Sequence, residues 1–405
     1  MHILLISHYY EPDSGAAAVR LSRLMKLLHQ RGHQITVLTT MPHYPQGKIQ
    51  DPYRGQFMSD EDRDGIRVIQ MWLWASPKKS IIFRLISQLS FMLTCALRGI
   101  FLPRPDVIFI ENQPIFTGLA GWFISKIKRR PYLLNVSDFW PEYLLAVGVL
   151  TEGNILYKIF KSLVNRTQKD ADAIVTLLEG LWESVQARIG VSDKGHVIMN
   201  AVDLERFNPD AETVTFREKY QLGTQKIISF VGTMGNHIDL EMMLDVAEHF
   251  KARDDVRFVF FGTGINRDIL DNRKDLSNVQ WTGWVEHREM PYAWASSYVT
   301  FWAVHNHELN RLSFQSKLYE ALASGVPPIV SVEGIIAEVL KKDNLGIPVP
   351  FGAKYELIEV LEHILDNPDL RDDMSQNARQ YALENFNPDD VADRYEAVLK
   401  DSVKN

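Results

Sequence analysis

Residues 310–330, NRLSFQSKLYEALASGVPPIV, place a lysine and a glutamate at the start of an apolar helix pattern. Lys317 and Glu320 are three residues apart, so a helix would put them on one face. A lysine at a helix N-terminus is electrostatically unfavourable unless an anion binds there. A glutamate can accept two hydrogen bonds from a vicinal diol such as a ribose. The pair therefore indicates a nucleoside-diphosphate site, and the alternative is a solvated Lys–Glu pair.

Two strand–loop–helix junctions could also bring an anion close to the backbone. The first is SHYYEPDSGAAAVRL, in which Gly15 precedes three alanines, and it lacks the G-x-G-x-x-G spacing of a dinucleotide site. The second is FVGTMGNHIDLEMML, with glycines at Gly232 and Gly235. Small residues permit close approach, and a helix N-terminus favours anions. An ordinary strand-to-helix turn is the alternative for the first junction.

The elements that must position these residues form two series of short apolar runs separated by helical patterns. We expect strands in the first series at 3–7, 34–39, 68–72, 107–110, 132–136, 173–176 and 197–199, and in the second at 227–231, 256–261, 279–281, 299–301 and 328–332. Continuous apolar strands between helices are typical of parallel sheets covered on both faces. The two series predict an α/β protein with two doubly wound domains.

Composition limits the class of protein. The chain has 405 residues, which suits two domains, and a net charge of −7, which argues against nucleic acid as a partner. Cys95 is the single cysteine, so an internal disulfide is excluded and a reducing cytoplasm fits. The scattered histidines lack metal-ligand spacing, so no metal is expected. The first residues, MHILLISHYYEP, read as a buried strand and not as a signal peptide.

Two basic and apolar segments, 78–104 and 122–130, need a separate explanation. The first is apolar for about twenty residues, close to the length of a membrane span. Arg84, Gln88 and Arg98 interrupt that run, and lysines and arginines flank both segments. A core helix of the first domain and a surface that lies on a membrane are both consistent with this pattern. A true span is the least favoured alternative, because it would remove a helix that covers the sheet.

The order of several motifs resembles a known family along the whole chain. These motifs are PHYPQGKI, YRGQF, DGIRVIQMWLWA, RPDVIFIENQP, NVSDFWPEYLLAVG, NAVDLERFNP, NVQWTGWV and SKLYEALASGVPPIV. They resemble a family-4 glycosyltransferase of GT-B architecture, in the bacterial branch that builds O-antigens, capsules and exopolysaccharides and includes N-acetyl-L-fucosamine transferase-like enzymes. The resemblance implies two Rossmann-like domains facing across a cleft and a final helix that crosses back to the first. It also implies a retaining transfer from a nucleotide-diphosphate sugar without a required metal or other cofactor.

The resemblance assigns roles to particular residues. Glu320 matches the second acid of the family's E-x7-E motif and would hold the ribose, while Lys317 would neutralise the departing diphosphate. Asp138 would contact a sugar or acceptor hydroxyl or assist as a base, unless it only caps a helix. The remaining donor-site residues that we expect are Ser14, Gly15, Gly232, Thr233, Gly235, Trp284, Val285, Phe314, Gln315 and Ser316.

Three positions depart from the family pattern. The first acid of E-x7-E falls on Leu312, Thr233 replaces a usual arginine, and Ser137 replaces a histidine beside Asp138. Leu312 cannot bond a sugar hydroxyl, so we expect a less polar group on the donor, such as a deoxy or N-acetylated sugar. The loop at 310–315 would then supply substitute contacts.

These observations define the expected organisation and function. We expect an N-terminal acceptor-binding domain at 1–200, a C-terminal nucleotide-sugar-binding domain at 204–385 and a C-terminal helix at 386–405 on the first domain. The expected function is a hexosyl or N-acetylhexosaminyl transfer, with a UDP-sugar preferred, to a lipid-linked or saccharide acceptor. The protein would lie in the cytoplasm, on the inner face of the plasma membrane. The alternatives are a nucleotide-sugar epimerase or hydrolase, or a non-catalytic subunit of a polysaccharide assembly complex.

Overall fold

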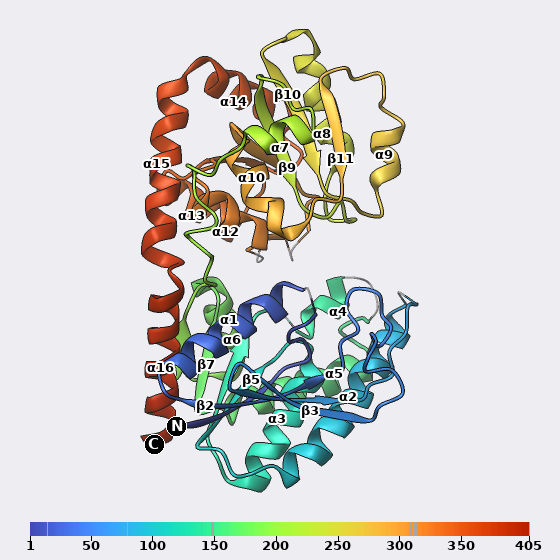
Figure 1. Ribbon diagram of the computed structural model, residues 1–405, viewed down its shortest axis with the longest axis vertical. Coiled ribbons are helices and arrows are strands. Elements are labelled where there is room, and N and C mark those ends of the chain that lie inside the picture. The colour runs from blue at the N-terminus through green and yellow to red at the C-terminus, as the bar shows by residue number, and fades with distance from the viewer. Residues whose placement is uncertain are drawn as a thin grey trace. The chain divides into compact units, whose positions relative to one another are not determined.

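The computed structural model describes residues 1–13, 15–78, 80–138, 140–146, 150–307, 310–311 and 314–404. Two of the residues predicted above, Ser14 and Leu312, therefore lie outside the described residues. The chain divides into two compact units (Figure 1). Unit 1 contains Met1–Asn200 and Pro388–Asn405, and unit 2 contains Ala201–Asn387.

Unit 1 is built on an eight-stranded sheet with the order β3-β4-β2-β1-β5-β6-β7-β8. The strands are β1 (His2–Ile6), β2 (Gln34–Thr40), β3 (Met58–Arg63), β4 (Ile66–Met71), β5 (Val107–Glu111), β6 (Tyr132–Val136), β7 (Ala173–Thr176) and β8 (Gly195–Val197). All neighbours are parallel except β3 and β4. Every residue of β5 and β6 is buried, as expected where helices cover both faces of a parallel sheet.

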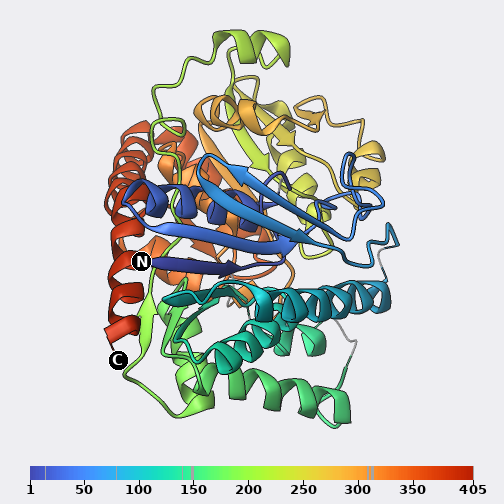
Figure 2. The same ribbon diagram turned by 60° about the horizontal axis from the view of Figure 1, so that its bottom comes forward.

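The helices of unit 1 surround this sheet. They are α1 (Ala16–Gln30), α2 (Ile81–Phe101), α3 (Ile115–Lys128), α4 (Glu142–Ala146), α5 (Ile155–Lys169), α6 (Glu179–Ile189) and α16 (Pro388–Lys404). Helix α2 packs beside α3, and α3 beside α5, so the three form one layer (Figure 2). After its path through unit 2 the chain returns to unit 1 as α16, which packs on α1, β5 and β6.

Unit 2 contains a six-stranded parallel sheet with the order β11-β10-β9-β12-β13-β14. Its strands are β9 (Lys226–Val231), β10 (Val256–Phe261), β11 (Val279–Gly283), β12 (Val299–Ala303), β13 (Pro328–Ser331) and β14 (Ile347–Val349). Its helices are α7 (Val214–Lys219), α8 (Leu240–His249), η1 (Phe250–Ala252), α9 (Arg267–Asp271), η2 (His287–Glu289), α10 (Met290–Ala295), α12 (Ser316–Ala323), α13 (Ile335–Lys342), α14 (Lys354–Asp366) and α15 (Pro368–Asn385).

The predicted fold class is confirmed, with differences at a few strands. Strand β3 was not predicted, because its sequence MSDEDR is charged and it pairs antiparallel at the sheet edge, where one face meets solvent. The short strand β14 was missed, and β8 begins two residues before the predicted run. Within the described ranges, no helix combines the length and the apolar character that a membrane span requires.

Candidate active site

Lys317 lies in the first turn of α12, over the carboxyl ends of two neighbouring strands of unit 2. Its ammonium nitrogen is 4.4 Å from the centre of the Phe230 ring on β9 and 4.5 Å from that of Trp302 on β12. Burial lowers the pKa of Lys317 to about 7, because the charged form loses hydration. No aspartate or glutamate among the described residues forms an ion pair with it. The two aromatic faces are therefore its main electrostatic support.

The predicted glycine loop of unit 2 passes directly beside this lysine. Gly232 follows β9 with a φ of +135°, and a Cβ added there would lie 3.7 Å from Lys317 Cδ. This backbone conformation is one that residues with side chains rarely adopt. Gly235 is also confined, since an added Cβ would lie 3.0 Å from the His237 ring. The exposed Thr233 lies between them.

A second glycine pair, Gly262 and Gly264, was not predicted. A Cβ on Gly262 would lie 2.0 Å from the Gly232 carbonyl oxygen, and one on Gly264 would lie 2.3 Å from the Met234 carbonyl oxygen. These two glycines therefore allow the loops after β9 and β10 to meet. The sequence FGTG after an apolar run was the available signal.

Glu320 occupies the next turn of α12 and has a defined partner. Its Oε2 accepts a hydrogen bond of 3.0 Å from the Trp294 indole on α10. Burial raises the pKa of Glu320, while that hydrogen bond and the positive charge of Arg206 oppose the rise. Because the indole uses only one carboxylate oxygen, the other retains acceptor capacity for a ligand. Neither Trp294 nor Arg206 was predicted.

The other predicted donor residues divide by their environment. Gln315, the N-cap of α12, has both side-chain polar atoms buried without a hydrogen-bond partner, a state that is unusual in folded proteins. The Phe314 ring packs on the Tyr319 ring, with 4.7 Å between the ring centres. Ser316 is exposed. After β11, Trp284 is 72% exposed whereas Val285 is buried. Only Val285 of that pair is therefore fixed by packing.

The predicted residues of unit 1 form a second group. Asp138 follows β6 and accepts a hydrogen bond from the Gln113 side-chain amide. Although Asp138 is exposed at the surface of unit 1, the protein atoms around its carboxyl reduce its hydration, and this loss of hydration together with the nearby negative charge of Glu111 raises its pKa to about 6. Gly15 is the N-cap of α1 with a φ of −73°, so it is not required for an unusual backbone conformation. A Cβ added at Gly15 would lie 3.4 Å from the Tyr44 ring.

A buried polar network below Asp138 was missed from the sequence. Glu111, fully buried at the end of β5, accepts hydrogen bonds from Arg20 at 2.6 Å, Asn135 at 2.8 Å and Ser137 at 2.7 Å. Asn135 in turn accepts a bond of 2.8 Å from the Tyr395 hydroxyl on α16. An acid that ends an apolar strand, as in VIFIE, was the only signal for this network.

The Asp138 carboxyl gives a pH prediction. If its ionised form takes part in transfer, activity should rise with pH through about 6, because the raised pKa keeps it protonated below that value. Glu111→Gln removes the neighbouring negative charge, so the rise in activity, the acidic limb of the pH profile, should move to lower pH. The measurement is kcat against pH for both proteins. Glu179→Gln, at an exposed position in unit 1, is the control and should leave the limb in place. An unmoved limb in a folded Glu111→Gln protein would contradict this role for Asp138.

Comparison with protein families agrees with this arrangement. Residues 15–201 match the model described as "Glycosyl transferase 4-like domain", and residues 213–381 match "Glycosyl transferases group 1". The two matches cover most of unit 1 and of unit 2 respectively. The chain is a glycosyltransferase of the GT-B fold and family-4 type.

Two relatives and two solved structures match almost the whole length of this glycosyltransferase at low identity. It is 22% identical to a GDP-mannose-dependent alpha-mannosyltransferase of Mycobacterium tuberculosis, over 98% of this chain and 97% of that protein. It is 21% identical to an alpha-monoglucosyldiacylglycerol synthase of Acholeplasma laidlawii, over 93% and 92%. Sucrose-phosphate synthase of Thermosynechococcus elongatus has a similar structure, with a TM-score of 0.75, 16% identity and coverage of 99% and 98%. The structure of Anabaena HepE in complex with UDP-glucose is also similar, with a TM-score of 0.71 and 14% identity. The match covers 99% of this chain and 100% of that one.

Proposed function

We propose that the protein transfers a sugar, with retention of configuration, from a nucleotide-diphosphate donor to a lipid-linked or saccharide acceptor in bacterial surface polysaccharide synthesis. The observation that carries the proposal is Lys317, which lies between two aromatic rings with no acidic partner among the described residues. A diphosphate would supply the missing negative charge. Gly232 and the N-terminal amides of α12 lie on the same side of unit 2 and suit the same anion.

The chemistry follows from the charges that develop when the anomeric C–O bond breaks. Negative charge grows on the departing diphosphate, and Lys317 with the helix amides would stabilise it without a metal. Retention fits attack from the face that the diphosphate leaves, with a diphosphate oxygen accepting the proton of the acceptor hydroxyl. Glu320 would hold the ribose through its free acceptor capacity. Asp138 would contact a hydroxyl group or assist as a base.

A UDP-sugar is the preferred donor in this proposal. Anabaena HepE, of the same fold, binds UDP-glucose, whereas the mycobacterial relative is named for GDP-mannose. The departure at Leu312 favours a deoxy or N-acetylated sugar. A thermal-shift screen of UDP-, GDP- and dTDP-sugars tests the choice, because a ligand that binds only the native state raises the unfolding temperature. Binding of none of them would refute the proposal, and hydrolysis or epimerisation without transfer would replace it with another enzyme activity.

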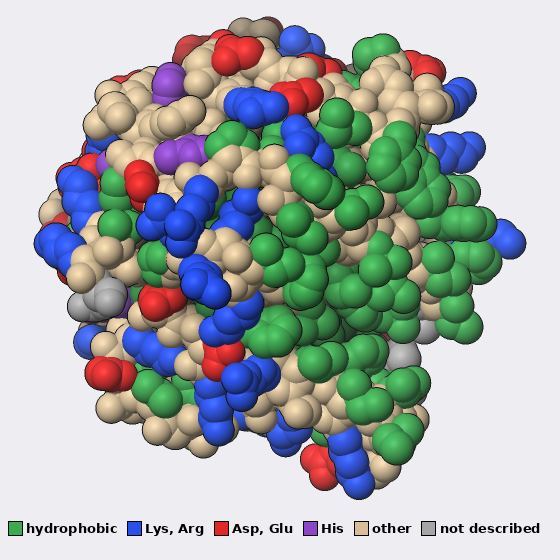
Figure 3. Space-filling view, turned by 90° about the horizontal axis from the view of Figure 1, so that it is seen from below, with side chains coloured by type: hydrophobic (Ala, Val, Ile, Leu, Met, Phe, Trp, Pro, Cys, Tyr) green, Lys and Arg blue, Asp and Glu red, His purple; other side chains and the backbone are tan. Residues whose placement is uncertain are grey.

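A membrane acceptor is supported by the surface of unit 1. Helices α2, α3 and α5 contain no aspartate or glutamate and carry eight lysines and arginines, although the whole chain has a charge of −7. Large apolar side chains are nevertheless exposed on all three: Ile82, Ile86, Leu89, Leu93, Leu97 and Phe101 on α2, Phe123 and Ile127 on α3, and Ile155, Leu156 and Ile159 on α5. Figure 3 shows a broad hydrophobic field bordered by lysines and arginines. This combination suits the surface of an anionic membrane.

We expect the protein to float with liposomes that contain phosphatidylglycerol, and to be released by salt, because basic residues contribute through screened attraction. Leu93→Ser with Leu97→Ser removes two of the most exposed α2 side chains and should reduce the bound fraction severalfold. The matched control is Ile265→Ser with Tyr355→Ser, which removes two exposed apolar side chains from unit 2. Equal flotation of both variants would argue against peripheral binding through this face.

A further inference from the structure

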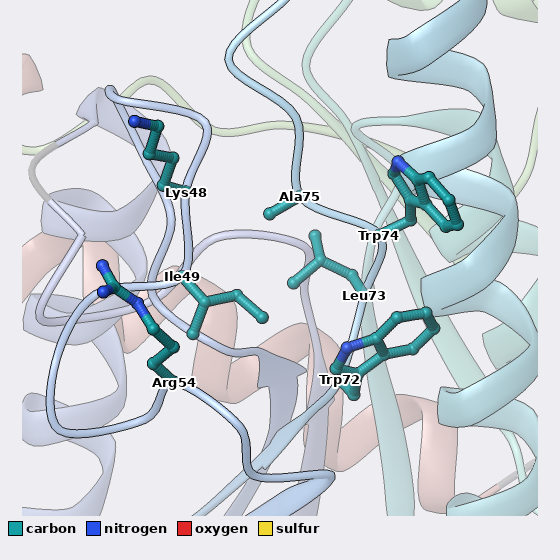
Figure 4. Close-up of a pocket in the computed structure, with 7 residues that line it drawn as sticks. All are labelled: Lys48, Ile49, Arg54, Trp72, Leu73, Trp74 and Ala75. Carbon is teal, nitrogen blue, oxygen red and sulfur yellow. The ribbon is translucent and has the colours of Figure 1, made fainter.

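A hollow of about 490 Å³ lies in unit 1 between the loop after β2 and the segment after β4 (Figure 4). Lys48, Ile49 and Arg54 come from the loop, and Trp72, Leu73, Trp74 and Ala75 from the segment. Ile49 and Leu73 point toward each other across the middle, with the two basic side chains on one side and the two indoles on the other. The hollow is thus apolar at its centre, and the charged ends of Lys48 and Arg54 lie at its outer edge, turned away from Leu73.

The basic side chains of the hollow are weakly compensated. Among the described residues, Arg54 forms an ion pair only with Asp51, at 3.8 Å, and 68% of its side chain is exposed. No ion pair of Lys48 appears within the described part of the chain. Exposed ion pairs of this kind contribute little and exchange readily for a better partner. Both cations are therefore available to an anionic group, and an arginine can bind a phosphate through two parallel hydrogen bonds.

The indole wall joins the hollow directly to helix α2. The Trp74 amide donates a hydrogen bond of 2.8 Å to Ser90 Oγ, and the Thr94 hydroxyl donates one of 2.9 Å to the Trp72 carbonyl. Both partners lie on α2, where the half-buried Ser90 and the buried Thr94 directly follow the exposed Leu89 and Leu93. Trp74 is itself 52% exposed, as indoles often are where protein, lipid and water meet. The hollow therefore lies at the border of the apolar face.

We propose that this hollow binds the phosphate-bearing head of a membrane amphiphile whose hydrocarbon tail lies along α2. Lys48 and Arg54 bind the phosphate oxygens, Trp72 and Trp74 pack on the region between head and tail, and the exposed row from Ile82 to Phe101 receives the tail. The residues belong to the PHYPQGKI, YRGQF and IQMWLWA stretches, which the donor site leaves unexplained. The inference rests on the proposed membrane acceptor, and it adds a specific head-group site to a general surface attraction.

The loop also gives the hollow a fixed relation to the predicted site of unit 1. Asp13 Oδ1 accepts hydrogen bonds from the amides of His43 and Tyr44, at 3.0 and 2.9 Å, and Tyr44 faces Gly15. The same loop continues to Lys48 after Gly47, which packs closely on the backbone of Ser76 and Pro77. Lys48 therefore lies four residues after Tyr44, the residue whose ring faces Gly15.

The test compares the full-length wild type with Lys48→Ala/Arg54→Ala. The control is Lys274→Ala/Arg288→Ala, which removes two exposed positive charges from unit 2. Binding is measured to a short-chain prenyl diphosphate in solution, to vesicles of phosphatidylglycerol, to vesicles of phosphatidylcholine and to inorganic phosphate. We expect the Lys48/Arg54 variant to lose about thirtyfold in affinity for an anionic amphiphile, as removal of two basic contacts near a lipid surface implies. The control should lose less than twofold.

Comparison of the four ligands identifies which molecule supplies the phosphate group. A loss confined to the prenyl diphosphate assigns the hollow to a lipid carrier, and an equal loss on phosphatidylglycerol vesicles assigns it to bulk lipid head groups. Either outcome supports the proposal. Equal losses in the variant and the control, or equal affinity for inorganic phosphate and amphiphile, would overturn it. Binding of UDP-sugars is measured separately on the same proteins, so a failure of the donor assignment is distinguishable from a failure of this site.

Discussion

Lys317→Met should lower kcat by about 10²–10³-fold, the usual cost of losing one preorganised electrostatic contact to a developing negative charge. Methionine retains the length and apolar contacts of the lysine stem between Phe230 and Trp302, so the fold should persist. The variant should also be at least as stable as the wild type, because it no longer holds a cation away from water. Steady-state transfer and thermal unfolding provide the two measurements.

The low pKa of Lys317 sharpens this prediction. A lysine with a pKa of about 7 is largely neutral at pH 8.5 in the free protein, and a bound diphosphate favours its charged form. Binding of UDP should therefore take up a proton, and affinity should fall as pH rises above 7. Calorimetry in two buffers of different ionisation enthalpy measures this uptake. Lys317→Met should abolish it, whereas Lys341→Met, at an exposed position on α13, should leave it intact. Normal turnover and proton uptake in Lys317→Met would rule out the assigned role.

In unit 2, the shared helix of Lys317 and Glu320 could be predicted because it is local in sequence. Lys317 and Glu320 share one helix, so their spacing placed them on one face before any tertiary contact was known. The groups that set their properties come from elsewhere. Phe230 and Trp302 belong to strands far apart in the chain, and Trp294 to another helix. An indole in a sequence gives no indication of whether it will cover a cation, accept a hydrophobic neighbour or bind a carboxylate.

The same distinction explains unit 1. Continuous apolar strands predicted the parallel sheet, since their burial on both faces leaves a direct signature in composition. Strand β3 and Glu111 carry the opposite signature, because an edge strand tolerates charge and a buried acid is stabilised by partners that the sequence does not identify. Segment 78–104 was ambiguous for a related reason. Helix α2 buries Phe91 and Cys95 against the sheet while exposing a second apolar row, so its composition alone resembles that of a core helix.

Glu320→Gln should weaken binding of UDP about 10–100-fold, because hydrogen bonds from hydroxyl groups to a carboxylate are stronger than those to a neutral amide. Glutamine still offers an oxygen to the Trp294 indole, so the contact that holds the side chain is kept. The change therefore separates ligand binding from local packing. Isothermal titration of UDP against both proteins gives the ratio of Kd values.

A second ligand locates the effect at the ribose. If Glu320 bonds the ribose hydroxyls, the wild type should bind 2′,3′-dideoxy-UDP much more weakly than UDP, and Glu320→Gln should show a smaller gap between the two ligands. Glu338→Gln, which neutralises an acid on α13, the next helix along the chain, should preserve the wild-type difference in affinity between the two ligands. If Glu320→Gln shows the same difference in affinity between UDP and 2′,3′-dideoxy-UDP as the wild type, the carboxylate acts only through Trp294 and the packing of α10 on α12. A reduced gap would show a direct bond, since a packing defect weakens both ligands equally.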